Sequence, residues 1–143
     1  MTNALIWRDG AMIEVEAESN GLGPVLNPPV DLVDYAADRR WRKEIGGIIV
    51  AGIPVATDDR AKLMITGARV AAMADPGWTT SWHGTDGNTY PVDAAAMVTI
   101  SDAVQAHVNA TFSTFAVVKA AIEAGEFTTA TEVDAAFAAE TPA

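Results

Sequence analysis

The segment from Asp93 to Gly125 constrains the fold most, because it predicts one helix of about 30 residues, roughly 45 Å long, in a chain of 143 residues. Apolar and small residues recur every seven positions along it. One set is Met97, Val104, Thr111 and Val118, a second is Ser101, Val108, Phe115 and Ile122, and Ile100 and Phe112 widen the stripe. The pattern predicts a helix that spans the whole core or one that meets copies of itself in a homo-oligomer.

Upstream of this helix, the spacing of the apolar residues changes twice. Gly46-Gly47 marks the first change, and Thr57-Asp58-Asp59 marks the second. Asp31–Glu44 has helical spacing with basic last turns and ends before Gly46-Gly47. The β-branched run Ile48–Val55 predicts a hairpin that turns at Ala51-Gly52. Asp58–Asp75 predicts a second helix that Pro76 and Gly77 stop. Its apolar residues are expected at Leu63, Met64, Ala68, Val70 and Ala71, and its flat side for close helix packing at Gly67, Ala68, Ala71 and Ala72.

A second hairpin is predicted between Trp78 and Pro91, with its turn at Gly84–Gly87. This segment gathers the candidate glycan or receptor contacts Trp78, Trp82, His83, Asp86 and Tyr90. Aromatic and polar groups of this kind stack on sugars or bases. Since Trp82 and His83 alternate along a strand, the competing interpretation is that one aromatic set packs on the helices.

The first 33 residues are expected to form a small N-terminal appendage to the main domain. Two short runs around Asp9-Gly10 indicate a β-hairpin, and a Pro/Gly-rich linker follows. An isolated hairpin is only marginally stable in water, so this one should dock on its own domain or on a neighbouring chain. The candidate partner-docking residues are Leu5, Trp7, Ile13 and Val15.

Residues 34–143 should form one α+β domain. It would have a helical core in which the long helix of the C-terminal half packs against short antiparallel β-hairpins. A short final helix is expected after Phe127, with Thr129 and Glu132 at the spacing of a capping box.

The sequence predicts no catalytic, cofactor or metal site. It contains no cysteine, and its two histidines, His83 and His107, lie on different predicted elements without an HExxH pairing. The formal net charge of −10 argues against nucleic acid and anionic membranes as partners. No stretch approaches the ~18 apolar residues of a membrane span, so no membrane insertion is expected.

Several segments resemble a known family when they are taken in order. They are Trp41, Gly46-Gly47-Ile48, Val50, Gly52-Ile53-Pro54, Thr57-Asp58, Ile65-Thr66-Gly67-Ala68, the Trp82 segment and the Asp93-Ala94 helix start. Their order resembles the phage-encoded domain of unknown function numbered forty-three seventy-six, which occurs in tail-fibre and tail-fibre-assembly genes of tailed phages and prophages. The resemblance covers about residues 38–124. Its motifs are structural residues, such as those at turns and helix starts, and not catalytic ones, so it implies no active site.

The resemblance implies a non-enzymatic structural component of a phage tail, in the tail tip, baseplate or fibre. Such a protein would be made in the host cytoplasm, reside in the virion and bind other phage tail proteins. Contact with a host surface glycan would add a role in host attachment. The alternative is a tail-fibre assembly chaperone that is absent from the mature virion.

Overall fold

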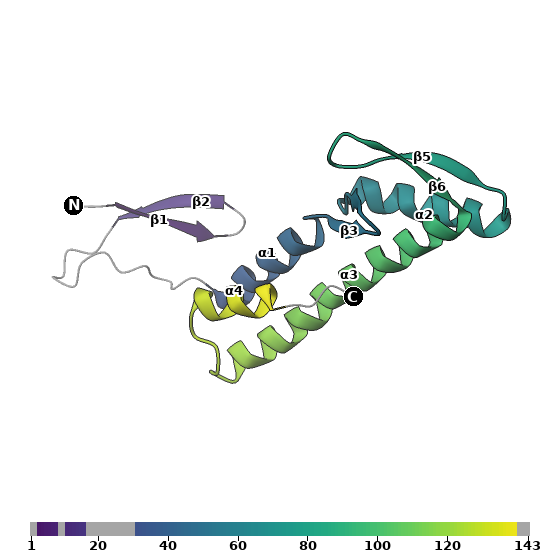
Figure 1. Cartoon of the computed structure of the whole chain (residues 1–143). Coiled ribbons are helices and arrows are strands. Elements are labelled where there is room, and N and C mark those ends of the chain that lie inside the picture. Colours follow the sequence, from purple (N-terminus) through teal and green to yellow (C-terminus); the bar gives the residue numbers. More distant parts are fainter. Residues whose placement is uncertain (1–2, 9–10, 17–30, 140–143) are drawn as a thin grey trace.

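The computed structural model describes residues 3–8, 11–16 and 31–139, the first two ranges by their backbone alone (Figure 1). The elements in chain order are β1 (Asn3–Arg8), β2 (Ala11–Glu16), α1 (Leu32–Glu44), β3 (Ile48–Val50), β4 (Ile53–Val55), α2 (Asp59–Ala74), β5 (Thr79–His83), β6 (Thr89–Asp93), α3 (Ala94–Glu123) and α4 (Ala130–Ala138). In these ranges the strands form three separate antiparallel pairs, β1–β2, β3–β4 and β5–β6. The predicted α+β class is confirmed.

The long helix α3 is the element on which the other helices pack (Figure 1). Helix α2 and the strands β3 and β6 contact α3, and so do α1 and α4. Two hydrophobic clusters result. One combines α2, β3, β4 and β6 with the first part of α3, from Ala94 to Val104. The other combines α1 and α4 with the last part of α3 around Val118. Helix α3 therefore spans both cores, which is the first of the two arrangements that its pattern predicted.

The buried face of α3 matches only part of the predicted stripe. Met97, Val104, Thr111 and Val118 are all buried, which confirms the first heptad set. The second set is half-buried, and the remaining buried positions are instead Ala94, Ile100, His107 and Ala121. Phe112 is half exposed and its ring lies under the guanidinium of Arg40, 4.6 Å from it. The heptad spacing cannot specify which residues beside the first set are buried. The positions of α1 and α2 around α3 decide which neighbouring stripe is covered.

Each of the four helices in the described part of the chain begins at an oxygen-bearing side chain that accepts hydrogen bonds from the first turn. Asp31 accepts from Val33 N at 2.9 Å, Asp58 from Ala61 N at 2.7 Å and Asp93 from Ala96 N at 2.8 Å. Thr129 and Glu132 form the predicted capping box at the start of α4. These contacts satisfy backbone N–H groups that have no partner within the helix. The helix starts are therefore encoded locally.

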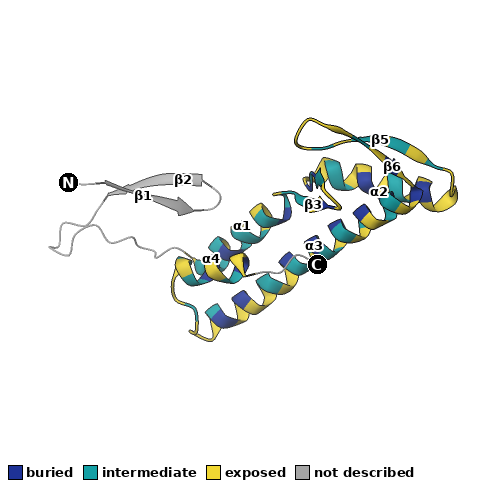
Figure 2. Ribbon diagram, viewed as in Figure 1, coloured by how far each residue is buried: buried dark blue, intermediate teal, exposed yellow. Residues whose placement is uncertain are grey.

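Helix α2 uses a different face for the core from the one its apolar residues suggested. Ile65 and Ala72 are buried, whereas Leu63, Met64 and Val70 are 76%, 51% and 65% exposed. The expected flat side is also divided, since Ala68 and Ala72 enter the core and Gly67 and Ala71 do not. Figure 2 shows exposed residues along α2. The small residues Ala68 and Ala72 thus allow α2 to pack closely on α3, and the larger side chains of Leu63, Met64 and Val70 remain exposed.

The β3–β4 connection is a two-residue turn in the left-handed region of the backbone map. Ala51 has φ of 49° and Gly52 has φ of 82°. Positive φ at both central positions matches the right-handed twist of a hairpin. Glycine adopts this conformation without a steric penalty, whereas alanine does so at a cost of about 1–2 kcal/mol. Ala51 is therefore a strained residue in an otherwise regular turn.

Replacing Ala51 should relieve this strain. Ala51→Asn is expected to raise the free energy of unfolding by about 0.5–1 kcal/mol, because asparagine tolerates the left-handed conformation. Gly52→Ala should lower it by about 1 kcal/mol. A Cβ at Gly52 would meet no atom within 4 Å, so that loss would come from the backbone alone. Urea denaturation measures both, and changes of the same sign would contradict this account.

Candidate functional site

The predicted aromatic hairpin forms, and its register separates the candidate residues. Strand β5 pairs with β6 so that Trp82 lies opposite Tyr90 and Thr80 opposite Val92. Val92 is buried, and both Trp78 and Trp82 pack against its cluster. Side chains directly opposite each other share one face of a hairpin. The two tryptophans therefore contribute to the core of the domain.

His83 and Asp86 lie elsewhere on the same hairpin. His83 is exposed, and its Nδ1 is 3.2 Å from Thr89 Oγ1. Asp86 accepts hydrogen bonds from Tyr90 Oη at 2.5 Å and from Asn88 N and Nδ2 at 3.0 Å each. The bond from Tyr90 is the main cause of a lowered pKa of Asp86. The structure thus joins Asp86 to Tyr90 at the turn, with His83 bonded separately across the strands.

The turn of this hairpin docks on the neighbouring hairpin. Thr85 N donates to Pro54 O at 3.1 Å. A Cβ on Gly84 would lie 2.6 Å from Asp86 Oδ1 and 2.9 Å from Tyr90 Cε2, so a side chain at this position would displace the Asp86 carboxylate or the Tyr90 ring. The backbone hydrogen bond from Thr85 therefore joins the β5–β6 turn to β4.

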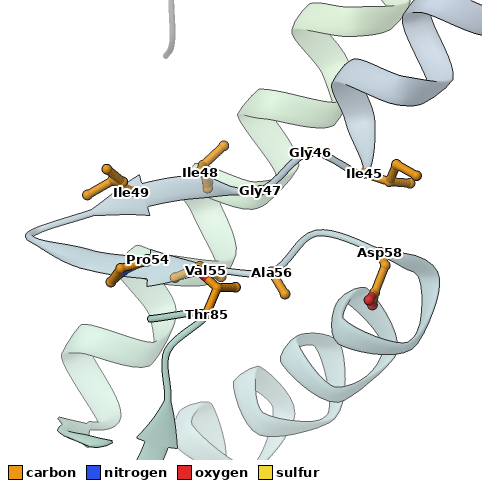
Figure 3. Close-up of a pocket in the computed structure, with 10 residues that line it drawn as sticks. All are labelled: Ile45, Gly46, Gly47, Ile48, Ile49, Pro54, Val55, Ala56, Asp58 and Thr85. Carbon is orange, nitrogen blue, oxygen red and sulfur yellow. The ribbon is translucent and has the colours of Figure 1, made fainter. Parts of the chain in front are cut away.

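A shallow depression of about 600 Å³ lies beside this contact (Figure 3). It is lined by Ile45, Gly46, Gly47, Ile48, Ile49, Pro54, Val55, Ala56, Asp58 and Thr85. Asp58 is the one charged residue among these ten, and its carboxylate caps α2 through Ala61 N. The other nine lining residues are aliphatic residues, Pro54, two glycines and Thr85. The lining offers no second ionisable group for acid-base chemistry.

The most buried ionic group that the structure describes joins α1 to α2. The carboxylate of Glu44, whose side chain is 10% exposed, pairs with Arg40 Nη1 at 2.5 Å and with Lys62 Nζ. Burial alone would raise the pKa of Glu44, but the hydrogen bonds from Lys62 and Arg40 outweigh it and hold this pKa below its usual value. The bond to Glu44 raises the pKa of Lys62. Each charge has a partner, so the loss of one partner would leave a largely buried charge uncompensated.

The backbone at the end of α1 is satisfied by side chains from two other segments. Thr57 Oγ1 donates to Glu44 O at 2.5 Å and accepts from Gly47 N at 2.9 Å. His107 Nε2 lies 2.9 Å from Lys43 O and 3.1 Å from Glu44 O. Both of these are acceptors, so Nε2 must carry the proton. We call Glu44, Lys62, Thr57 and His107 the α1 junction.

The sequence did not predict this junction. Its pattern predicts only that Glu44 lies in the last turn of a helix and that His107 and His83 lie on different elements. One signal was present, because His107 lies seven residues after the buried Ile100 and so occupies a polar position in an apolar stripe. A buried polar side chain needs a hydrogen-bond partner. Its partners lie about 63 residues away and could not be read from spacing.

One family model matches most of the chain. The family model described as domain of unknown function (DUF4376) matches residues 29–139. The chain belongs to this family. The DUF4376 match includes α1 to α4 with both hairpins between them and leaves β1 and β2 outside. The family that the sequence resembled is thereby confirmed, and its description assigns no activity. No curated protein and no solved structure matched the chain.

The candidate docking residues of the DUF4376 protein lie on strands of which the structure gives the backbone only. The predicted hairpin forms, and it pairs Leu5 with Glu14, Trp7 with Met12, Ile13 with Ile6 and Val15 with Ala4. The side chains of these residues lie outside the described part of the chain. Their role in partner docking stays a prediction.

Two further properties concern the described residues of the DUF4376 protein. Within residues 31–139, no group of three or more histidine, aspartate or glutamate side chains is placed to hold a metal ion. No helix in the same range combines the length and apolar character needed to cross a bilayer.

The junction predicts a pH-dependent stability. Glu44→Gln should lower the free energy of unfolding at pH 7 by about 1–3 kcal/mol, because it removes charge-assisted hydrogen bonds. The folded pKa of Glu44 lies below 4.5, so its stabilisation is complete above pH 4.5 and is lost as pH falls through the folded value. The folded pKa of Lys62 lies above its usual value of 10.5. The stabilisation from Lys62 is therefore lost as pH rises through this raised, folded pKa.

Urea denaturation of wild type and Glu44→Gln across this pH range measures the effect. Glu123→Gln is the matched control, because Glu123 pairs with Lys119 where both side chains are about half exposed. Its effect should stay below about 0.5 kcal/mol. Equal losses in the two variants would show that burial adds nothing at Glu44.

Trp82 and His83 are adjacent on the aromatic hairpin, but their replacement should affect the free energy of unfolding differently. Trp82→Ala should lower the free energy of unfolding by about 2–4 kcal/mol, because a partly buried indole leaves the core. His83→Ala should change it by less than about 0.5 kcal/mol, as expected for an exposed side chain. Thermal or chemical unfolding measures both. An unchanged Trp82→Ala variant would show that the indole is available for a ligand.

Proposed function

We propose that this DUF4376 protein is a non-enzymatic structural component of a bacteriophage tail that binds other tail proteins. One observation carries the proposal. Large apolar side chains on the described helices and hairpins are 47–76% exposed. They are Trp41, Ile49, Leu63, Met64, Val70, Met73, Phe112 and Val117. Exposed apolar side chains are candidates for contacts with other proteins.

The exposed apolar residues fall on several elements, which favours a protein with more than one neighbour. Leu63, Val70 and Met73 lie on α2, Phe112 and Val117 lie on α3, and Ile49 lies on β3 beside the depression. Permanent assemblies bury more apolar surface than transient complexes do. A subunit of a tail tip, baseplate or fibre has such permanent neighbours. The assignment to a phage tail rests on the genes in which the resembled family occurs.

Host attachment through a glycan has weaker support within this proposal. Sugar recognition by stacking requires exposed aromatic faces. Trp78 and Trp82 pack against the core, so the accessible polar groups of the hairpin are those of His83 and the turn. Adsorption through this surface would have to use hydrogen bonds from these groups.

The alternative is a tail-fibre assembly chaperone that leaves before the virion matures. The same exposed apolar residues could cover a fibre chain during assembly. The net charge of −10 would keep such a complex soluble. This alternative places the protein in the host cytoplasm of the infected cell and not in the particle.

Quantitative mass spectrometry of purified mature virions tests the two functions. A tail subunit should be present at a fixed ratio to the tail-tube protein, because it is built into every particle. A chaperone should be abundant in the infected lysate and missing from virions. The control is a phage capsid protein measured in both fractions. Absence from both the virion and the assembly intermediates would exclude both functions.

A further inference from the structure

The face of α2 that points away from the core carries a regular stripe. Arg60, Leu63, Gly67, Val70 and Ala74 follow one another at intervals of three and four residues, and all five are exposed. This is the spacing of a seam between two helices. The core residues Ile65 and Ala72 lie on the opposite side of the same helix. We call these five residues the α2 stripe.

Gly67 is the residue in the stripe that the chain's own fold does not require. Glycine inside a helix is less favourable than alanine. A Cβ at Gly67 would meet no atom within 4 Å, and its φ is not in the positive range. Packing within the chain therefore gives no reason for glycine here. A helix from outside that approaches closely would give one.

We propose that a second copy of this chain packs on the α2 stripe, with its α2 antiparallel to the first across a two-fold axis. In this arrangement Leu63 lies beside Ala74 of the partner subunit, and Gly67 lies beside Val70 of the partner subunit. Each larger side chain thus meets a small residue, so the two helices can approach closely. The same contacts occur twice, as a two-fold interface requires.

The pattern of large and small residues in the stripe complements itself in the antiparallel direction, which points to a copy of the chain as the occupant. Charge favours the same direction, since the carboxylates next to Arg60 are already used, Asp58 in capping α2 and Asp59 in a pair with Lys62. Arg60 lies at one end of α2, and Asp75 is the residue that ends it. An antiparallel pair places Arg60 near the partner's Asp75 at both ends of the interface. A parallel pair would place Arg60 near the partner's Arg60, where like charges repel. Arg60 makes none of the ion pairs found within residues 31–139.

Two methionines extend the same surface. Met64 and Met73 flank the stripe on its two sides and are 51% and 67% exposed. Methionine side chains are flexible and fill irregular gaps between packed helices. The 16 residues of α2 give a seam of roughly 24 Å. A seam of this length favours a dimer that dissociates on dilution. This inference does not depend on the phage-tail proposal.

Sedimentation velocity of the full chain over a roughly hundredfold concentration range tests the proposal. Wild type should change from monomer to dimer as its concentration rises. Val70→Glu should weaken the dimer at least about 100-fold, because it places a carboxylate in the seam without a partner. Its circular dichroism spectrum should match that of wild type, since Val70 is exposed in the monomer.

Val117→Glu is the matched control. It makes the same substitution at a valine with similar exposure, 70% against 65%, on α3. It should leave the dimer intact. A wild type that stays monomeric throughout would overturn the proposal. So would a dimer that Val117→Glu disrupts and Val70→Glu does not, because that dimer would form through α3.

A charge exchange tests the direction of the two helices. Arg60→Glu and Asp75→Arg should each weaken self-association, because each creates two repulsive contacts. An equimolar mixture of the two variants should form a heterodimer. At one end the introduced glutamate of the first variant would meet the introduced arginine of the second, and at the other end the native pair would form. Failure of the mixture to dimerise, with both variants folded, would exclude the antiparallel arrangement.

Discussion

The end of helix α1 is the place on which the rest of the structure depends. Its last carbonyl groups accept hydrogen bonds from Thr57, which follows β4, and from His107 on α3. The carboxylate of Glu44 at the same end binds Lys62 on α2. The junction therefore connects α1, the β3–β4 hairpin, α2 and α3 at one point. It lies between the two hydrophobic clusters, so it links the parts of the domain that share α3. Because its groups are largely removed from water, the loss of one partner leaves the others unsatisfied.

This construction leaves much apolar surface uncovered. Helix α3 has partners along one side, and α2 contributes mainly small residues to the core. Several larger apolar side chains of these two helices consequently remain exposed, namely Leu63, Met64, Val70 and Met73 of α2 and Phe112 and Val117 of α3. The charged groups of the junction are used in ion pairs. Asp86 of the β5–β6 turn binds Tyr90 and Asn88 within its own hairpin, and a backbone hydrogen bond from Thr85 to Pro54 joins the turn to β4. The exposed apolar side chains are the basis of the proposed contacts with other proteins.

The elements could be predicted because their boundaries depend on neighbouring residues. Asp58, Asp93 and the Thr129–Glu132 pair cap helices, and Ala51-Gly52 forms the expected turn. The candidate site could not be predicted to the same degree. The sequence showed that Trp82 and His83 alternate, but the packing of the domain decided that the tryptophan turns inward. Leu63 and Val70 were hydrophobic enough for the core, yet α3 packs on the other face of α2.

The sequence by itself determined the order and ends of the elements, the α+β class and the family. These properties follow from short-range effects, namely capping, turn conformation and hydrophobic period, which act within a few residues. Only the tertiary structure decided which faces are buried, that His107 and Thr57 meet the end of α1, and that α2 carries an exposed apolar stripe. Such contacts join residues distant in sequence, and they depend on how whole helices pack against each other. The amphipathic pattern of one helix is too weak to specify that arrangement when both of its faces are apolar.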